Sequence, residues 1–165
     1  MATDRYVNPV AEAGEKPYPS NQVSGAKTIS MAVSFEKTAQ DGNSSVLRLF
    51  KSLPATLVPL SIKIMNDALA GATAVKLGMY KPEKGVKISE DALAAALDIS
   101  SAHGANGGLE ALTFDVVNVG KTLGEILNAK LSNNEMYDTV DICLTGTTFG
   151  TAAGTISVIA TFLQA

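Results

Sequence analysis

The chain is poor in the residue types that carry most protein chemistry. Its 165 residues include one histidine, one cysteine and no tryptophan. Because Cys143 is alone, the chain forms no internal disulfide and assembles no zinc site from cysteines. We therefore expect no catalytic residue, no cofactor and no metal, and the composition favours a protein that holds other molecules together.

Charge is also scarce. Charged residues make up 18% of the chain, below the usual ~25%, and the net charge is −3. No basic stripe of the kind that nucleic-acid binding needs is present. The opening MATDRYVNPV lacks the apolar run of a signal peptide, and residues 150–165 are too few and too rich in threonine to span a bilayer. We therefore expect synthesis in a reducing cytoplasm, with no nucleic-acid and no membrane partner.

The sequence divides into an arm and a body. Residues 1–25 contain three prolines and no periodic apolar face, which predicts an extended N-terminal arm. The scattered apolar side chains in this segment, Tyr6, Val10 and Tyr18, are candidate anchors for a partner. Residues 26–165 form the second predicted domain. This segment is long enough to bury a hydrophobic core that needs no disulfide or bound metal to stabilise it.

The sequence of the body, residues 26–165, predicts mainly β structure. Apolar and polar residues alternate with a period of two in most segments between turn signals. Leu60, Ile62 and Ile64, for example, are expected on one face of a strand. Six or more such strands indicate an antiparallel β-sandwich or barrel. Strands are predicted at 28–35, 45–50, 60–64, 74–80, 112–117, 137–145 and 155–163, the last two joined as a wide hairpin.

Two short helices are predicted in the connections between strands. Ser89 is a candidate N-cap for a helix over 89–97, with two acidic residues in its first turn and strong helix formers after them. The second helix is expected over Val119–Leu131, with Val119, Leu123, Ile126 and Leu127 on one face.

Three patterns resemble reactive sites, and each has a structural reading that we prefer. Gly120-Lys121-Thr122 looks like the end of a phosphate-binding loop, but Asp115 stands where that loop needs its first glycine, so we read a helix start. His103 lies in a glycine-rich loop near Asp98, without a nucleophile-elbow motif, and is read as a solvent-facing loop residue.

The third pattern lies in the strand predicted at 137–145. No basic residue near Cys143 in the sequence would lower the pKa of its thiol. Asp138 and Asp141 should project to different faces, so they do not form a cation site.

Several strands resemble those of a known group of proteins. The segments carrying this similarity are Ser45–Pro54, Ser61–Asp67, Ala74–Tyr80, Asp138–Thr145 and Ala153–Phe162. They look like the capsid cement or decoration proteins of tailed bacteriophages, and the similarity covers residues 45–163. It implies a jelly-roll β-domain on the outside of the capsid shell, bound to the phage major capsid protein and locking coat subunits together.

Three functions follow as hypotheses. The leading one is a structural virion protein, synthesised in the host cytoplasm, that cements an icosahedral shell as a homodimer or homotrimer. The alternative is a receptor- or carbohydrate-binding β-sandwich module of a phage tail or fibre, for which four tyrosines and five phenylalanines are few stacking platforms. An enzyme would require His103, Cys143 and carboxylates to converge.

Overall fold

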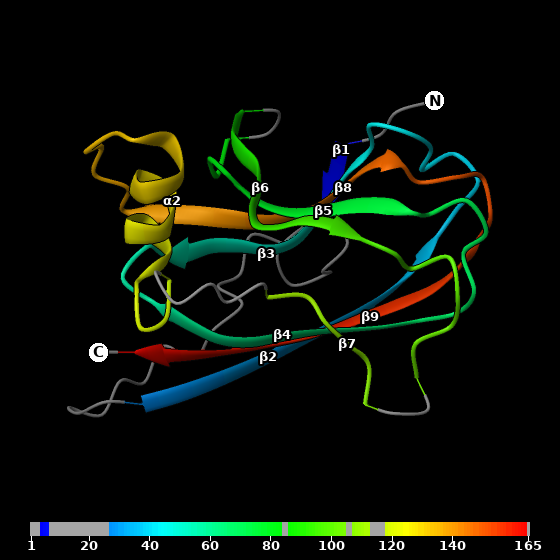
Figure 1. The fold of residues 1–165 in the computed structure, drawn as a ribbon, viewed down its shortest axis with the longest axis horizontal. Coiled ribbons are helices and arrows are strands. Elements are labelled where there is room, and N and C mark those ends of the chain that lie inside the picture. The colour runs from blue at the N-terminus through cyan, green and yellow to red at the C-terminus, as the bar shows by residue number, and fades with distance from the viewer. Residues whose placement is uncertain (1–3, 7–26, 84–85, 105–106, 113–117, 165) are drawn as a thin grey trace.

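The computed structural model describes residues 4–6, 27–83, 86–104, 107–112 and 118–164. Within them two β-sheets lie face to face, with one helix at an end of the sandwich (Figure 1). The elements are β1 (Asp4–Tyr6), β2 (Lys27–Lys37), β3 (Val46–Pro54), β4 (Val58–Asn66), β5 (Ala74–Tyr80), β6 (Lys87–Leu97), β7 (Leu109–Glu110), α2 (Leu123–Leu131), β8 (Thr139–Thr148) and β9 (Gly154–Gln164).

The strand order is that of a jelly roll. Sheet A has the order β1-β3-β8-β5-β6 and sheet B the order β2-β9-β4-β7. Apart from β5 and β6, consecutive strands from β2 onward alternate between the two sheets, so two four-stranded sheets face each other once β1 is set aside. Every described pairing is antiparallel except that of β1 with β3. The predicted mainly β, jelly-roll-like sandwich is confirmed.

The core lies between the inner faces of the sheets, as the alternation predicts. In β2 the odd-numbered residues are buried and the even-numbered ones exposed over most of its length. Strand β9 also alternates, with its even-numbered residues buried, and the two strands pair over eleven residues without a break. The inward side chains of these two strands are Ile29, Met31, Val33, Phe35, Ile156, Val158, Ala160 and Phe162.

A bulge in β4 corrects one detail of the expected alternation. Ile62 and Ile64 are fully buried, whereas Leu60 is 43% exposed. The register between β4 and β9 shifts between Pro59 and Ser61, so Leu60 is the extra residue of the bulge and turns to the outer face.

The predicted helix over 89–97 is wrong, because this segment belongs to β6. The free edge of β5 supplies backbone partners and a place for Leu93 and Leu97 in the core, which outweighs the helix propensity of the alanines. The register is irregular: Leu77 pairs with Ala94 and Met79 with Ser89, so the residues between leave the ladder.

Helix α2 begins later than predicted. Thr122 is its N-cap, and Val119, expected on the buried face, is 67% exposed. Leu123, Ile126 and Leu127 are buried, as expected. The helix is fixed over the turn between β3 and β4, because the backbone N–H groups of Leu123 and Gly124 donate to the carbonyls of Leu57 and Ala55, each at 2.9 Å.

The last two strands do not form the predicted hairpin. Strand β8 lies in sheet A and β9 in sheet B, so the residues between them cross from one sheet to the other. Phe149 is fully buried in this crossing and lies against Gly146, where a Cβ would stand 2.3 Å from its ring. Of the strand predicted at 112–117, residues 113–117 lie outside the described part.

Candidate functional site

The residues with reactive side chains do not come together. His103 follows β6, with Nε2 3.0 Å from the carbonyl oxygen of Asp98, and its backbone pairs with Asn66. Cys143 lies fully buried in the middle of β8. Within the described residues no three histidine, cysteine, aspartate or glutamate side chains are placed to hold a metal ion. His103 is half-buried, and the contacts of its ring and backbone hold the loop that contains it in place.

The outer face of β8 is buried, although the alternation predicts that it faces water or a partner. Asp141 and Arg48 are both fully buried and form an ion pair with 3.1 Å between Oδ2 and Nη1. The other carboxylate oxygen of Asp141 accepts the backbone N–H of Ser52 at 2.8 Å. Asp138, directly before β8, is exposed, whereas Asp141 is fully buried. Asp141 acts as a structural anion within sheet A.

Strand β6 helps to cover this face. A Cβ on Gly78 would lie 2.3 Å from the carbonyl oxygen of Ser89, so the backbone of β6 passes directly over β5 at this glycine. The Tyr80 hydroxyl lies 2.9 Å from that of Thr145 in the same region. Burial raises the pKa of Tyr80. The outer side of sheet A is therefore a second packed layer in this region.

Two surface hollows flank this layer. The larger, about 500 Å³, is lined by Ser44, Val46, Lys76, Tyr80, Lys87, Glu90, Thr145, Gly146 and Thr147. Its three charged residues form one ion-pair cluster: Glu90 accepts from Lys76 at 2.6 Å and from Lys87 at 3.2 Å. The Lys76 ammonium lowers the pKa of Glu90 and keeps it a carboxylate.

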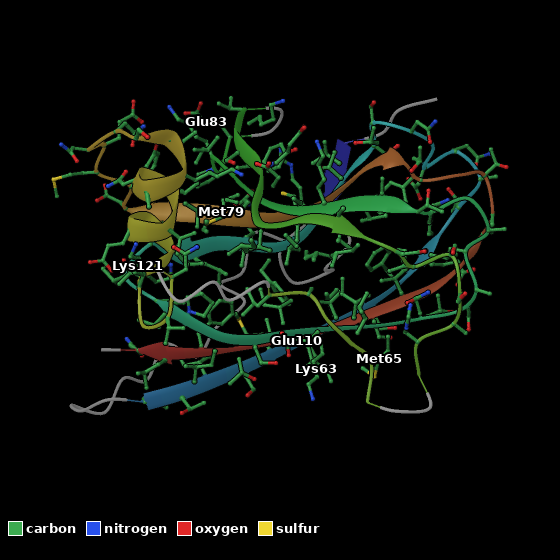
Figure 2. The ribbon with its side chains drawn as sticks, in the orientation of Figure 1. Lys63, Met65, Met79, Glu83, Glu110 and Lys121 are labelled. Carbon is green, nitrogen blue, oxygen red and sulfur yellow. The ribbon has the colours of Figure 1, made fainter. Side chains whose placement is uncertain are left out.

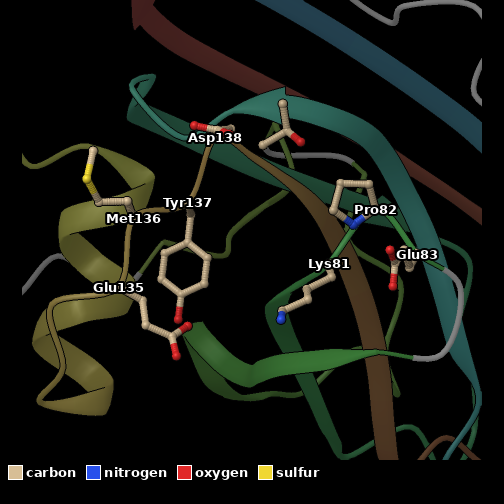
Figure 3. A pocket seen from close by; sticks show the side chains of 8 residues that line it. Lys81, Pro82, Glu83, Glu135, Met136, Tyr137 and Asp138 are labelled. Atoms are coloured by element: carbon tan, nitrogen blue, oxygen red, sulfur yellow. The ribbon is translucent and has the colours of Figure 1, made fainter.

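The smaller hollow, about 330 Å³, lies between the end of β5 and the segment before β8 (Figure 3). It is lined by Lys81, Pro82, Glu83, Glu135, Met136, Tyr137, Asp138 and Thr139. Burial raises the pKa of Tyr137, whose ring forms part of the wall. Neither hollow contains a histidine or a cysteine, so neither presents an evident nucleophile or general base that titrates near neutrality.

The suspected phosphate-binding segment is a helix cap. The Thr122 hydroxyl accepts the backbone N–H of Glu125 at 3.2 Å, and the Glu125 carboxylate accepts the backbone N–H of Thr122 at 2.8 Å. This reciprocal pair is a capping box. The Glu125 carboxylate therefore already accepts a backbone N–H at the start of the helix. The interpretation of this segment as a capped helix start is confirmed.

The outer face of sheet B carries many exposed small side chains. Across β2, β9 and β4, the register aligns rows such as Ser30–Thr161–Ser61 and Ala32–Ile159–Lys63. The hydroxyls of Ser30 and Thr161 lie 3.2 Å apart, so they satisfy each other. We call this surface, formed by the outward residues of β2, β9 and β4, the outer B face.

Two charged side chains, Glu36 and Lys63, and four larger apolar ones, Leu60, Met65, Ile159 and Leu163, lie among the small residues of the outer B face. Ile159 is 40% exposed at its centre and Leu60 stands at the β4 bulge. Lys63 projects away from the sandwich on this side (Figure 2). The alternation of apolar and polar residues predicts which side chains of β2 and of β9 point outward. The register that places the two strands side by side could not be read from the sequence.

The predicted arm is described only at Asp4–Tyr6. These residues form β1 and pair in parallel with Val46–Arg48 of β3, so this part of the chain belongs to sheet A. Tyr6 is the last residue of β1. Val10 and Tyr18 lie outside the described residues, and the partner-binding role of the three remains a prediction. No helix in the described part is long and apolar enough to cross a membrane.

Comparison with known proteins identifies the fold. No protein-family model matches the chain, and neither does any curated protein sequence. Among solved structures, a chain in the capsid of Ralstonia phage GP4 is similar with a TM-score of 0.59 and 15% identity, covering 98% of this chain and 99% of that one. A chain in the capsid asymmetric unit of cyanophage Pam1 is similar with a TM-score of 0.50 and 15% identity, covering 93% and 96%. At this identity the likeness shows a shared fold along nearly the whole chain.

Proposed function

We propose that this chain is a structural virion protein that binds the outside of an icosahedral phage capsid and cements its coat subunits as a homo-oligomer. The observation that carries the proposal is the likeness to chains of two phage capsids, which extends over 98% and 93% of this chain. In this proposal the chain catalyses no reaction, which agrees with the scattered positions of His103 and Cys143.

We further propose that the outer B face contacts the shell. A sheet face with few charges costs little to desolvate, because charges are the most expensive groups to bury. The paired hydroxyls keep their partners when water leaves: Ser34 and Ser157 lie 2.8 Å apart, like Ser30 and Thr161. Ile159 adds apolar area at the centre. Each copy gains a small free energy, and many copies bound to one shell add these contributions.

The proposal is tested with purified empty shells of the phage that encodes the chain. Wild-type protein should co-sediment with them and raise the temperature at which they disrupt. Ile159→Glu should lower occupancy, because a carboxylate would be buried at the centre of the contact. Val119→Glu is the matched control, since Val119 is 67% exposed beside α2, and it should bind like wild type. Absence of wild-type binding would overturn the proposal, and equal binding of both variants would overturn the assignment of the face.

The role of the predicted arm is tested in the same shell-binding assay. If Val10 and Tyr18 anchor it on the coat, Val10→Ala and Tyr18→Ala should each reduce shell occupancy while leaving the unfolding temperature of the free protein unchanged. Unchanged occupancy would remove the arm from the interface.

The tail- or fibre-module alternative makes the opposite prediction, binding of the free protein to glycans or cell surfaces but not to shells. Of the aromatic side chains that the structure describes, all are buried except that of the half-buried Tyr137, so this part of the chain offers a sugar few stacking surfaces.

A further inference from the structure

Lys37 stands at a core position of β2 although its side chain is charged. The inward residues of this strand are odd-numbered, and Lys37 ends that series fully buried. Burying an ammonium is costly unless hydrogen bonds or a counter-charge compensate for the lost water. Burial lowers the pKa of Lys37, and the charge of Asp41 acts in the opposite direction. The charge therefore needs a built environment at this end of the sandwich.

Three backbone carbonyls supply that environment. Nζ of Lys37 donates to the carbonyl oxygens of Ala152 at 2.8 Å, Gly150 at 3.3 Å and Thr38 at 3.4 Å. It also lies 5.4 Å from the centre of the Phe149 ring, whose face attracts cations. An ammonium has three N–H donors and no acceptor, so three carbonyls match its hydrogen-bonding capacity. We call these three carbonyls and the Phe149 ring the carbonyl cage.

Much of the carbonyl cage is held by contacts in which Lys37 takes no part. The backbone N–H of Phe149 donates to Oδ1 of Asn43 at 2.8 Å, and the Phe149 ring is fully buried. Gly150 has a φ of +62°, and a Cβ on it would lie 2.4 Å from the carbonyl oxygen of Ala70. The segment between β4 and β5 therefore packs closely against a backbone conformation that favours glycine. We expect the carbonyl cage to keep its shape when the side chain at position 37 is shortened.

We propose that the crossing from β8 to β9 is a binding site for one monovalent cation, which the chain fills with its own Lys37 ammonium. Backbone carbonyl oxygens and an aromatic face are ligands that suit ammonium and potassium. The bound ammonium ties the end of β2 to the crossing segment, because two of its three carbonyl partners belong to that segment. A shorter side chain at position 37 leaves the site open to a cation from solution.

The site lies at one end of the outer B face. Lys37 pairs with Gly154, the first residue of β9, at the end of the ladder that joins β2 to β9. The bound charge therefore fixes the start of the middle strand of that face. The inference stands without the proposed function, because it is measured on the free protein. A failure here leaves shell binding to be judged by its own assay.

The test is thermal and urea unfolding of the full-length Lys37→Ala variant in mixtures of ammonium chloride and tetramethylammonium chloride at one ionic strength. Tetramethylammonium is too large for the carbonyl cage and has no N–H donor. In this salt alone the variant should unfold at a lower temperature than wild type, and ammonium should restore part of the loss. Above its dissociation constant, each tenfold rise in ammonium should raise the folding equilibrium constant about tenfold, as one bound cation requires. Wild type should not distinguish the two salts.

Lys37→Met is the matched control. Its side chain fills the space of the lysine stem without carrying a charge, so it should lose stability and regain none of it in ammonium. A measurement on the wild-type chain needs no variant: with isotope-labelled lysines, the Nζ protons of Lys37 should remain visible by NMR under conditions in which those of the exposed Lys63 exchange with water too fast to be seen.

Four results would each overturn the inference. They are a Lys37→Ala variant as stable as wild type, no difference between the two salts for that variant, an equal recovery of Lys37→Met in ammonium, and a Lys37 ammonium that exchanges its protons as fast as that of Lys63.

Discussion

The buried ion pair in sheet A gives the sharpest prediction for stability. Arg48 and Asp141 are both fully buried, 3.1 Å apart, and the Arg48 guanidinium lies 5.5 Å from the centre of the Tyr80 ring. Arg48→Met would leave the Asp141 carboxylate buried without this cation. Removing one partner of a buried pair costs about 3 to 5 kcal/mol, because the remaining charge stays desolvated. In a chain of this size that corresponds to a fall in unfolding temperature of about 6 to 20 °C.

The assay is urea and thermal unfolding followed by circular dichroism, with two comparisons. Lys87→Met removes an ion pair with Glu90 in which the lysine is 56% exposed, and should cost about 0 to 1 kcal/mol. The double variant Arg48→Met/Asp141→Asn should cost about 1 to 3 kcal/mol less than the sum of its single variants, because it removes both charges together.

Two results would refute this reasoning. One is a cost for Arg48→Met no greater than that of Lys87→Met. The other is strict additivity in the double variant. Either would mean that water or another group compensates Asp141, and that the outer side of sheet A is more open than its burial implies.

Two further predictions concern packing and pH. Gly78→Ala should destabilise the fold by about 1 to 3 kcal/mol, because its Cβ would lie 2.3 Å from the carbonyl oxygen of Ser89, whereas Gly104→Ala, with nothing within 4 Å, should be neutral in the same unfolding assay; equal effects would contradict the close strand crossing. Stability should also fall on acidification below about pH 4.5, the ordinary pKa of glutamate, because the Lys76 ammonium holds the folded-state pKa of Glu90 below that value and the unfolded chain takes up the proton first. Urea unfolding from neutral to acid pH should show a smaller loss for Glu90→Gln than for wild type, and an equal loss would exclude this pair as a contributor.

The strands were predictable where apolar and polar residues alternate along the sequence. β2 and β5 occur close to the positions that alternation predicts, and β8 and β9 within a few residues. The local sequence pattern gave a wrong prediction where pairing with a strand distant in sequence determined the structure. The alanines of β6 favour a helix, but pairing with β5 and the close passage of Ser89 and Glu90 over Gly78 hold this segment as an irregular strand. Leu60 keeps the alternation in sequence, yet a bulge turns it outward.

The surfaces were less predictable than the strands. Alternation places Asp141 and Cys143 away from the core, but it contains no sign that Arg48, 93 positions earlier, buries its charge there. Likewise, the sequence shows small outward residues in β2 and β9 separately, and only the register between them makes one face. Both failures have the same cause: contacts between residues distant in sequence depend on strand order, which a period of two does not encode.

The most direct test of the central claim is electron cryo-microscopy of empty shells of the encoding phage incubated with the purified chain. The account predicts ordered density for the chain on the outer surface, bridging neighbouring coat subunits, with the outer B face toward the shell. Density confined to the inner surface or to a tail, or bare shells at saturating protein, would contradict it.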